Sequence, residues 1–444
     1  FDFSFTADKN ETTKTHFFSE SSKKLDFNNF DESNLNLKLQ QTSNDTYLKT
    51  YKMKSPIIKD TSTLKSSLEI NAYREDLSFN ADFQVYENLA IEKTSDRYEF
   101  IYPSYDLFKQ INNNTNLDGN FSLNSSGYAK HYNTNIFEKV IINDFVFNSN
   151  SKFLNNGLKN NYNFLIKNTN SDAINSEKYS NSMNHSFASI FEFNSSYPLI
   201  KKDKLYKNIL KPKMSLKLSP SNTKNMRNEN RRIDINNIFS LNRIGSNETV
   251  EGGASLTFGT EFSKINEFNK EIFGAKIANI YRPKKNNNLP TNSSLGNKTS
   301  DIVGSLNYSP NEIIKIGYDF SLDSNLSENN YQLLGTEIKV NNFISTFEYL
   351  NENNTKNSES YITNKTSYII NDSKSLTFEI RENKKTKLTE FYNLIYQYRN
   401  DCLIAAIEYN KDYYTDRNLI PEESIFFKLT IIPFGETSTP NLKQ

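Results

Sequence analysis

Residues Tyr396–Ile432 read YQYRNDCLIAAIEYNKDYYTDRNLIPEESIFFKLTII. This stretch predicts a strand, a tight turn with the only cysteine, a second strand, a polar loop and a closing strand. The closing strand alternates between an apolar set and a mostly polar set, which are Ile425, Phe427, Leu429 and Ile431 against Phe426, Lys428 and Thr430. Alternation at period two means that the two faces of a sheet meet different environments. A chain that closes on such a strand is typical of a membrane β-barrel.

The composition favours the same class. Only 36% of the residues are hydrophobic, yet 13% are aromatic, with 33 Phe and 26 Tyr and no Trp. Disordered chains are poor in aromatic residues, which argues against disorder. A barrel accounts for both values, because half of each strand faces a wet interior and aromatic girdles lie at the membrane interfaces. No run of about 18 apolar residues occurs, which excludes a helical membrane protein.

The alternation recurs along the chain, most clearly where Ile314, Ile316, Tyr318, Phe320 and Leu322 alternate with Lys315, Gly317, Asp319 and Ser321. Polar stretches such as 112–116, 219–232 and 284–299 separate the predicted strands and are interpreted as turns and loops. With about 9–11 residues for each transmembrane strand, the length predicts on the order of twenty strands in an all-β, antiparallel transmembrane barrel. A soluble β-sandwich array or a β-solenoid also alternates and stays open as an alternative.

No pattern indicates catalysis, so we predict that the chain is not an enzyme and has no catalytic, cofactor or metal site. His16, His131 and His185 lie far apart without partners at metal-ligand spacing. The stretch Gly245–Gly253 lacks the GK[ST] ending of a phosphate loop, and a strand-connecting turn is the better interpretation. The net charge of +1 gives no reason to expect a nucleic acid partner.

Several blocks of sequence resemble the lipopolysaccharide-assembly outer-membrane proteins of the LptD (OstA/Imp) family, in particular its alphaproteobacterial branch. The C-terminal block DCLIAAIEYNKDYYTDRNLIPEESIFFKLTI is similar to the end of that family. Three further blocks resemble it in the family's order: YPLIKKDKLYKNILKPK (197–213), NIFSLNRIGSNETVEGG (237–253) and NSSLGNKTSDIVGSLNY (292–308). The blocks spread across the second half of the chain. The first half is similar to the family only in its general pattern of residues.

This resemblance implies an outer-membrane barrel of ~26 strands with a periplasmic jelly-roll domain upstream. The start FDFSFTADKN is not a signal peptide, and we expect residues 1–434 to be the C-terminal part of the barrel and 435–444 a short periplasmic tail. The implied function is insertion of lipopolysaccharide into the outer leaflet through a lateral seam. The implied partners are an LptE-type lipoprotein plug, a periplasmic bridge of LptA/LptC-type jelly rolls, lipopolysaccharide and outer-membrane lipid.

The resemblance also assigns expected roles to residues. The last strand would form one side of the seam, through Ile425, Phe427, Leu429, Ile431 and Pro433. Pro433 cannot donate a ladder hydrogen bond; we favour an ordinary strand terminator over a deliberately weakened edge. Cys402 would lie in a periplasmic turn and form a disulfide with a cysteine near the N-terminus of the mature protein. Alternation gives Lys315, Asp319 and Lys428 as residues that face the lumen, and a register error of one residue would invert this assignment.

Two other functions remain open. A passive diffusion porin shares the strand pattern but needs neither a jelly roll nor a lipoprotein plug. A surface β-structural protein without transport would leave lipopolysaccharide export intact when it is depleted.

Overall fold

The computed structural model describes residues 1–6, 13–50, 55, 57–58, 60–91, 95–353, 358–413, 421–431 and 435–438. The described strands form one sheet of 25 strands. The first half of the sheet contains β1 (Asp2–Thr6), β2 (Lys14–Leu25), β3 (Glu32–Thr42), β4 (Thr63–Arg74), β5 (Leu77–Asn88), β6 (Tyr98–Ile111), β7 (Gly119–Tyr132), β8 (Ile136–Ser149), β9 (Lys152–Phe153), β10 (Lys159–Ile174), β11 (Asn184–Ser196), β12 (Leu199–Lys202) and β13 (Tyr206–Ser219).

The second half contains β14 (Gly253–Asn266), β15 (Glu271–Tyr281), β16 (Ile302–Tyr308), β17 (Ile314–Leu322), β18 (Asn329–Val340), β19 (Phe343–Glu352), β20 (Glu359–Asn371), β21 (Lys374–Asn383), β22 (Leu388–Arg399), β23 (Leu403–Asp412), β24 (Glu422–Ile431) and β25 (Gly435–Ser438). The described helices are short: α1 (Tyr47–Thr50) and the 3₁₀ turns η1 (Ser95–Arg97) and η2 (Ser294–Gly296).

Each strand pairs antiparallel with the strand that follows it, so the sheet is a continuous meander. The exceptions are β9 and β12, which continue the lines of β8 and β11: β9 pairs with the start of β10, and β12 pairs with β13. The predicted all-β antiparallel barrel is thus confirmed. A single curled sheet is neither a sandwich array nor a solenoid.

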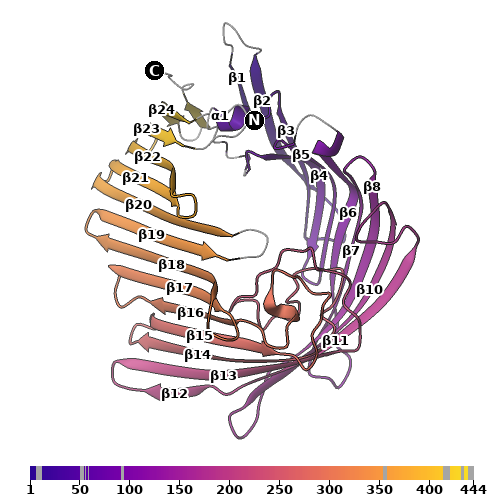
Figure 1. Cartoon of the computed structure of the whole chain (residues 1–444). Coiled ribbons are helices and arrows are strands. Elements are labelled where there is room, and N and C mark those ends of the chain that lie inside the picture. The colour runs from indigo at the N-terminus through magenta and orange to yellow at the C-terminus, as the bar shows by residue number, and fades with distance from the viewer. Residues whose placement is uncertain are drawn as a thin grey trace.

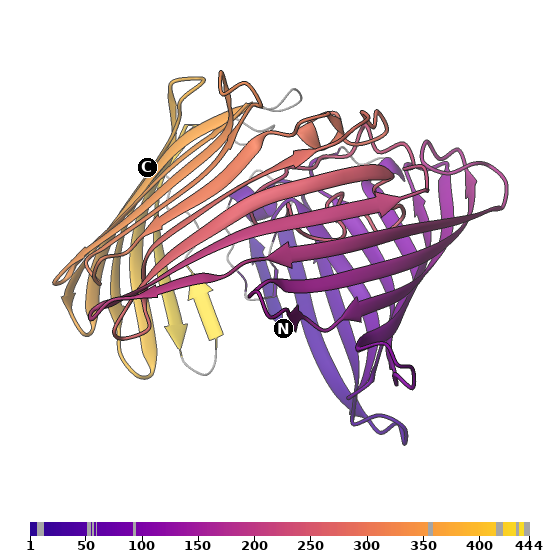
Figure 2. The same cartoon turned by 90° about the horizontal axis from the view of Figure 1, so that it is seen from below.

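The sheet curls into a ring, and its two ends, β1 and β24–β25, approach each other on one side (Figure 1). Turned by 90°, the strands run obliquely between the two rims of the ring, as expected for a tilted barrel (Figure 2). Among the described residues, no strand pairing connects β1 with β24 or β25. Within the described residues, the ladder of hydrogen bonds therefore does not continue from β24 and β25 to β1.

Alternation along each strand produces an apolar outer face. In β11 the exposed residues include Phe187 and Phe191, whereas Ile190 and Glu192, on the other face, are buried. In β24 the residues Ile425, Phe427 and Ile431 are between 42% and 44% exposed, although they are large and apolar. Nearly every strand thus exposes apolar side chains on one face. Such a face is stable in contact with a lipid bilayer and unfavourable in contact with water.

The two rims of the ring differ in the length of their connections. One rim carries tight turns, for example between β4 and β5, between β18 and β19, and between β22 and β23; we call it the turn end. The opposite rim carries the long connections, above all residues 220–252 between β13 and β14 and residues 282–301 between β15 and β16. We call this rim the loop end.

Residues 435–438, which the sequence analysis assigned to a tail, form β25 and pair with Lys428–Ile431 of β24. Within the described residues, no helix has the length and apolar character needed to cross a membrane.

Candidate functional site: the barrel interior

Two long connections fold into the ring rather than away from it. We call residues 220–252 inner loop 1 and residues 282–301 inner loop 2. Figure 1 shows inner loop 2, with η2, inside the ring, and Figure 2 shows the same segment near one rim. Both loops exceed the roughly 12–15 residues of ordinary connections, a length that usually has a functional reason. Their apolar residues pack with the wall in one core: Met226, Ile233, Ile238, Ile244, Ala278, Ile280, Leu289, Leu295 and Val303.

Contacts with these loops identify the inner face of the sheet. The Ser321 hydroxyl of β17 donates to Asp301 Oδ2 at 3.0 Å, and Lys167 of β10 donates to the Asn247 carbonyl at 2.7 Å. Residues two apart on a strand share a face, and directly paired residues on neighbouring strands share it as well. The lumen face can therefore be followed from strand to strand.

A buried ion cluster joins both inner loops to the wall. Arg243 of inner loop 1 donates from Nε to Glu251 Oε2 at 2.8 Å, and its Nη2 hydrogen-bonds Oε1. Arg282 reaches the same Glu251 Oε1 through Nη2, while its Nε donates to the Leu295 carbonyl of inner loop 2 at 2.8 Å. The Arg243 guanidinium also donates to Thr257 Oγ1 on β14 at 2.8 Å.

The guanidinium groups of this cluster are charged at neutral pH. Burial lowers the pKa of Arg243 to about 9, and burial together with the neighbouring Arg243 charge lowers the pKa of Arg282 to about 9. Because two cations share the Glu251 carboxylate, removal of that carboxylate would leave both of them uncompensated in a low-dielectric interior. Glu251 therefore holds inner loop 1, inner loop 2 and the wall together.

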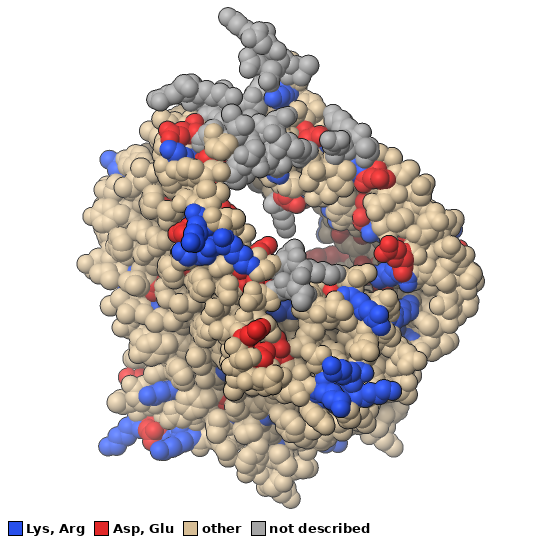
Figure 3. All heavy atoms as spheres, in the orientation of Figure 1, with Lys and Arg blue, Asp and Glu red and all other residues tan. Residues whose placement is uncertain are grey.

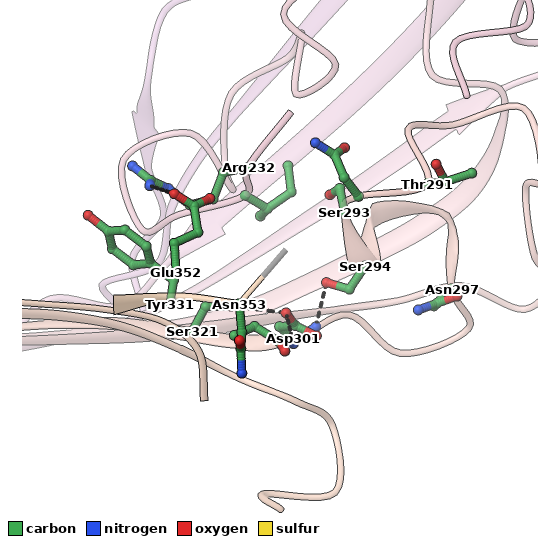
Figure 4. Close-up of a pocket in the computed structure, with 13 residues that line it drawn as sticks. Arg232, Thr291, Ser293, Ser294, Asn297, Asp301, Ser321, Tyr331, Glu352 and Asn353 are labelled. Atoms are coloured by element: carbon green, nitrogen blue, oxygen red, sulfur yellow. Dashed lines mark hydrogen bonds and ion pairs between the residues drawn. The ribbon is translucent and has the colours of Figure 1, made fainter. Parts of the chain in front are cut away.

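Two further anchors fix inner loop 1 on opposite sides of the ring. On one side Arg232 lies 3.8 Å above the Tyr331 ring of β18 and 3.5 Å from Glu352 of β19, beside a polar cavity of about 200 Å³ (Figure 4). On the other side Lys178, from the β10–β11 connection, lies 2.8 Å from Glu248. Inner loop 1 thus spans the interior from the β10–β11 wall to the β18–β19 wall.

The inner loops fill only part of the ring. In the space-filling view an opening remains toward the side where β1 and β24 lie, whereas the part that contains the inner loops is filled (Figure 3). The interior is thus divided into a filled part and an open part.

The lumen face of β17 to β24 carries a row of polar residues, of which the last two, Asn410 and Ser424, are buried. Directly paired lumen-face positions on β17 to β24 are, in order, Lys315, Glu337, Thr346, Lys365, Glu379, Asn393, Asn410 and Ser424. We call these eight residues the polar row. Because the strands are tilted, the row is oblique: it begins near the turn end of β17 and reaches the loop end of β24.

The three residues expected to face the lumen lie on the face that contacts the inner loops or continues the polar row. Lys315 and Asp319 share their face of β17 with Ser321, and Lys315 pairs with Glu337 at 2.6 Å. Lys428 lies on the same face of β24 as Ser424 and is 2.8 Å from Glu408 Oε2 on β23.

The expected seam residues Ile425, Phe427 and Ile431 point outward from β24, and Leu429 is on the same face. Pro433 lies outside the described residues. Cys402 is exposed in the turn between β22 and β23, and its backbone N–H donates to Asn400 Oδ1 at 3.0 Å. In the described part of the chain, no group of three or more His, Cys, Asp or Glu residues could hold a metal ion.

No sequence pattern pointed to Arg243, Glu251 or Arg282 as interior residues. Arg243 and Glu251 lie within the block 237–253 that carried the family resemblance, and charged residues of a strand connection are usually solvated. The indication that could have identified them is the number of apolar residues around them, such as Ile238, Leu241 and Ile244, which a solvated loop would not need.

A protein-family model described as LptD, LPS transport system D, matches residues 14–416. A search of curated proteins finds no match. Among solved structures, the chain is similar to a mutant of the ferric enterobactin receptor PfeA of Pseudomonas aeruginosa, with 8% identity, a TM-score of 0.37, and coverage of 83% of this chain and 71% of that chain. It is also similar to the siderophore receptor PirA of Acinetobacter baumannii (7% identity, TM-score 0.38, 84% and 72% coverage) and to a mutant porin of Rh. blastica (8%, 0.26, 72% and 100%). The fold assignment rests on the strand pairing of the chain itself.

Proposed function

Because the chain belongs to the LptD family of LPS transport system D, we propose that its barrel releases lipopolysaccharide sideways into the outer leaflet, at the side where β24 and β25 end the sheet. Membership of this family makes the chain a transport protein of the cell outer membrane and not an enzyme. The sideways route is the part that we propose.

Physical chemistry favours a lateral exit. Each CH₂ group of an acyl chain costs about 0.8 kcal/mol to leave in water, and unpaired hydroxyl groups cost roughly 2–7 kcal/mol to place in hydrocarbon. A lipid with a large sugar part therefore needs an apolar path for its tails beside a polar path for its sugars. A barrel that opens along one side offers both at once.

The polar row is the observation that carries this proposal. It places hydroxyl, amide, carboxylate and ammonium groups along the wall, from Lys315 near the turn end toward the loop end of β24, where its last two members, Asn410 and Ser424, are buried. On the opposite face of the same strands, Leu394, Ile407 and Phe427 are exposed and apolar. Sugars would follow the row while the tails stay in contact with the outer face at the edge of β24.

The orientation follows from the connections. Outer-membrane barrels have short periplasmic turns and longer external loops, so we place the turn end in the periplasm and the loop end outside. In this orientation the lipid enters at the turn end from LptA/LptC-type jelly rolls. The open part of the ring is the space for an LptE-type lipoprotein plug, because the inner loops occupy the remainder.

Photo-cross-linking tests the route. A photoreactive residue at Asn393, within the polar row, should form adducts with newly made lipopolysaccharide in cells, whereas one at Lys276, on the β15 wall beside the inner loops, should not. Equal labelling at both positions, or at neither, would contradict a route along the polar row.

Depletion tests the function itself. Loss of the full-length protein should stop new lipopolysaccharide from reaching the cell surface. Normal surface delivery after depletion would instead support a porin or a structural protein of the surface.

A further inference from the structure

A cavity of about 590 Å³ opens at the loop end, away from the polar row. One wall is formed where β13 ends and β14 begins, at residues 219–223 and 252–254. The other wall is formed by the first residues of inner loop 2, 283–288, with Arg227 of inner loop 1 beside them. We call this cavity the rim cavity.

The rim cavity is lined by three cations, Arg227, Lys284 and Lys285, and by no acidic residue. No ion pair is formed by these three side chains with any residue that the structure describes. Three other cations of the inner loops have acidic partners: Arg232 lies near Glu352, and Arg243 and Arg282 share Glu251. Three cations without an acidic partner among the described residues therefore lie together at this cavity. Figure 3 shows Lys and Arg side chains gathered over the filled part of the ring.

The backbone under these cations is fixed by hydrogen bonds between the two inner loops. Asn286 donates to Thr223 Oγ1 at 2.8 Å, and Asn288 donates to the Thr223 carbonyl at 3.0 Å. Arg227 donates from Nε to the Asn287 carbonyl at 2.6 Å, which holds its guanidinium at the edge of the cavity and directs Nε away from any ligand. A preformed cavity binds a ligand at a smaller entropic cost than a flexible one.

The buried ion cluster behind the cavity adds to its positive potential. The Arg243 and Arg282 guanidinium groups share the single Glu251 carboxylate, which leaves an excess of one positive charge in the cluster. Arg282 Nη1 donates to the carbonyl of Gly252, at 3.3 Å, and Gly252 lines the rim cavity. Charge in a low-dielectric interior is screened less than charge at the surface, so this excess attracts anions.

We propose that the rim cavity binds the phosphate group of a lipid headgroup in the outer leaflet. Phosphate suits this site because it accepts hydrogen bonds from guanidinium, ammonium and amide groups at once. The volume admits a phosphate together with the sugar that carries it. The cavity lies at headgroup level, because the neighbouring Tyr281 ends β15 and is 51% exposed, as expected for the aromatic girdle of a barrel. The choice of lipopolysaccharide as that lipid rests on the proposed function, whereas the preference for phosphate does not.

Binding to the purified full-length protein tests this site. Mixed micelles would carry lipopolysaccharide, or the same lipid after enzymatic removal of its phosphates, and inorganic phosphate would be titrated separately. The test variant is Lys284→Gln/Lys285→Gln. The matched control is Lys298→Gln, an exposed lysine of the same loop that does not line the cavity. We expect the test variant to bind lipopolysaccharide roughly tenfold more weakly than the wild type and the control do. We also expect the wild type to lose affinity for the dephosphorylated lipid, to the level that the test variant shows for the intact lipid.

Equal affinity of the test variant and the control would overturn the site. Equal affinity of the intact and dephosphorylated lipids would overturn the phosphate preference. Inorganic phosphate that binds as tightly as the lipid would overturn the assignment to a headgroup. Both variants should keep the heat-dependent gel mobility of a folded barrel, since these lysines are exposed. Because the assay measures binding and not delivery, a failure here is distinguishable from a failure of the proposed transport function, which depletion tests separately.

Discussion

The Arg243 guanidinium and the Glu251 carboxylate form a two-pronged ion pair inside the barrel, with Nε 2.8 Å from Oε2 and Nη2 hydrogen-bonded to Oε1. Arg282 hydrogen-bonds the same carboxylate and also the Leu295 carbonyl. One carboxylate therefore links inner loop 1 to inner loop 2. The filled part of the ring depends on this link, because both loops use it.

Glu251→Gln should release the inner loops. The substitution leaves two buried guanidinium groups without a counter-charge, and breaking a buried pair in this way costs about 3–5 kcal/mol. The strand ladder does not involve this side chain, so we expect the barrel to remain folded while its interior opens. Single-channel recordings in planar bilayers should show a higher conductance than the wild type.

The control for this prediction is Glu261→Gln. Glu261 lies on the lumen face of β14, and its side chain is 30% exposed and pairs with Lys213 at 2.5 Å. We expect its conductance to match the wild type. If both variants conduct alike, the Glu251 link does not hold the loops.

Gly252→Val should disturb the base of inner loop 1 for a steric reason. A Cβ atom at Gly252 would overlap the Ser221 carbonyl oxygen and lie 3.0 Å from the Thr223 nitrogen, and both are backbone atoms that cannot rotate away. Overpacking of this kind costs about 1–3 kcal/mol. Limited trypsin digestion should cleave inner loop 1 faster at Arg231 and Arg232. Gly335→Ala is the control, since nothing lies within 4 Å of its added Cβ; an unchanged digestion of the Gly252→Val variant would refute the close approach.

The sequence predicted the wall of the barrel because period-two alternation is a local property. Ile314 to Leu322, the clearest alternating stretch of the sequence, became β17. The ion cluster was not predictable in the same way. Glu251 and Arg282 belong to different connections, and only the inward folding of both loops brings them together. In the sequence they resemble solvated loop charges, and the energetic reason for their burial is a long-range contact that alternation does not encode.

Lys428 and Glu408 form an ion pair on the lumen face beside the edge of the sheet, with both side chains 10% exposed and Nζ 2.8 Å from Oε2. Lys428→Met should lower the free energy of unfolding by about 3 kcal/mol, because Glu408 would keep its charge without this partner. The double variant Lys428→Met/Glu408→Gln should recover part of that loss. Urea titrations of the heat-dependent gel mobility measure both values. The single variant Glu408→Gln completes the comparison. If the loss of stability in the double variant equals the sum of the losses in the two single variants, the two residues do not interact.

The connection between β17 and β18 should weaken at low pH. Hydrogen bonds from the Glu328 backbone, and then from Ser327 and Asn325, lower the pKa of Asp323 below its ordinary value. The charged form is therefore favoured in the folded loop. Its contribution is present above the ordinary aspartate pKa of about 3.9 and is lost as the pH falls through the lower folded value.

Hydrogen exchange measures this loss. After correction for intrinsic rates, the amides of Ser327 and Glu328 should exchange faster at pH 2 than at pH 5, and Asp323→Asn should exchange faster already at pH 7. Asp372→Asn, in the exposed turn between β20 and β21, is the control. Equal protection at the two pH values would show that the Asp323 carboxylate does not stabilise the loop.

Cys402 lies exposed at the turn end and is the only cysteine of the 444 residues. The orientation proposed above places this turn in the oxidising periplasm, where an accessible thiol tends to be bridged. We therefore propose that Cys402 forms a disulfide with a cysteine that lies outside this sequence. On a non-reducing gel, the full-length protein from cells should migrate differently from the reduced protein, and Cys402→Ser should abolish or alter that difference. A Cys402→Ser variant with the same non-reducing mobility as the wild type would leave Cys402 as a free thiol at the rim.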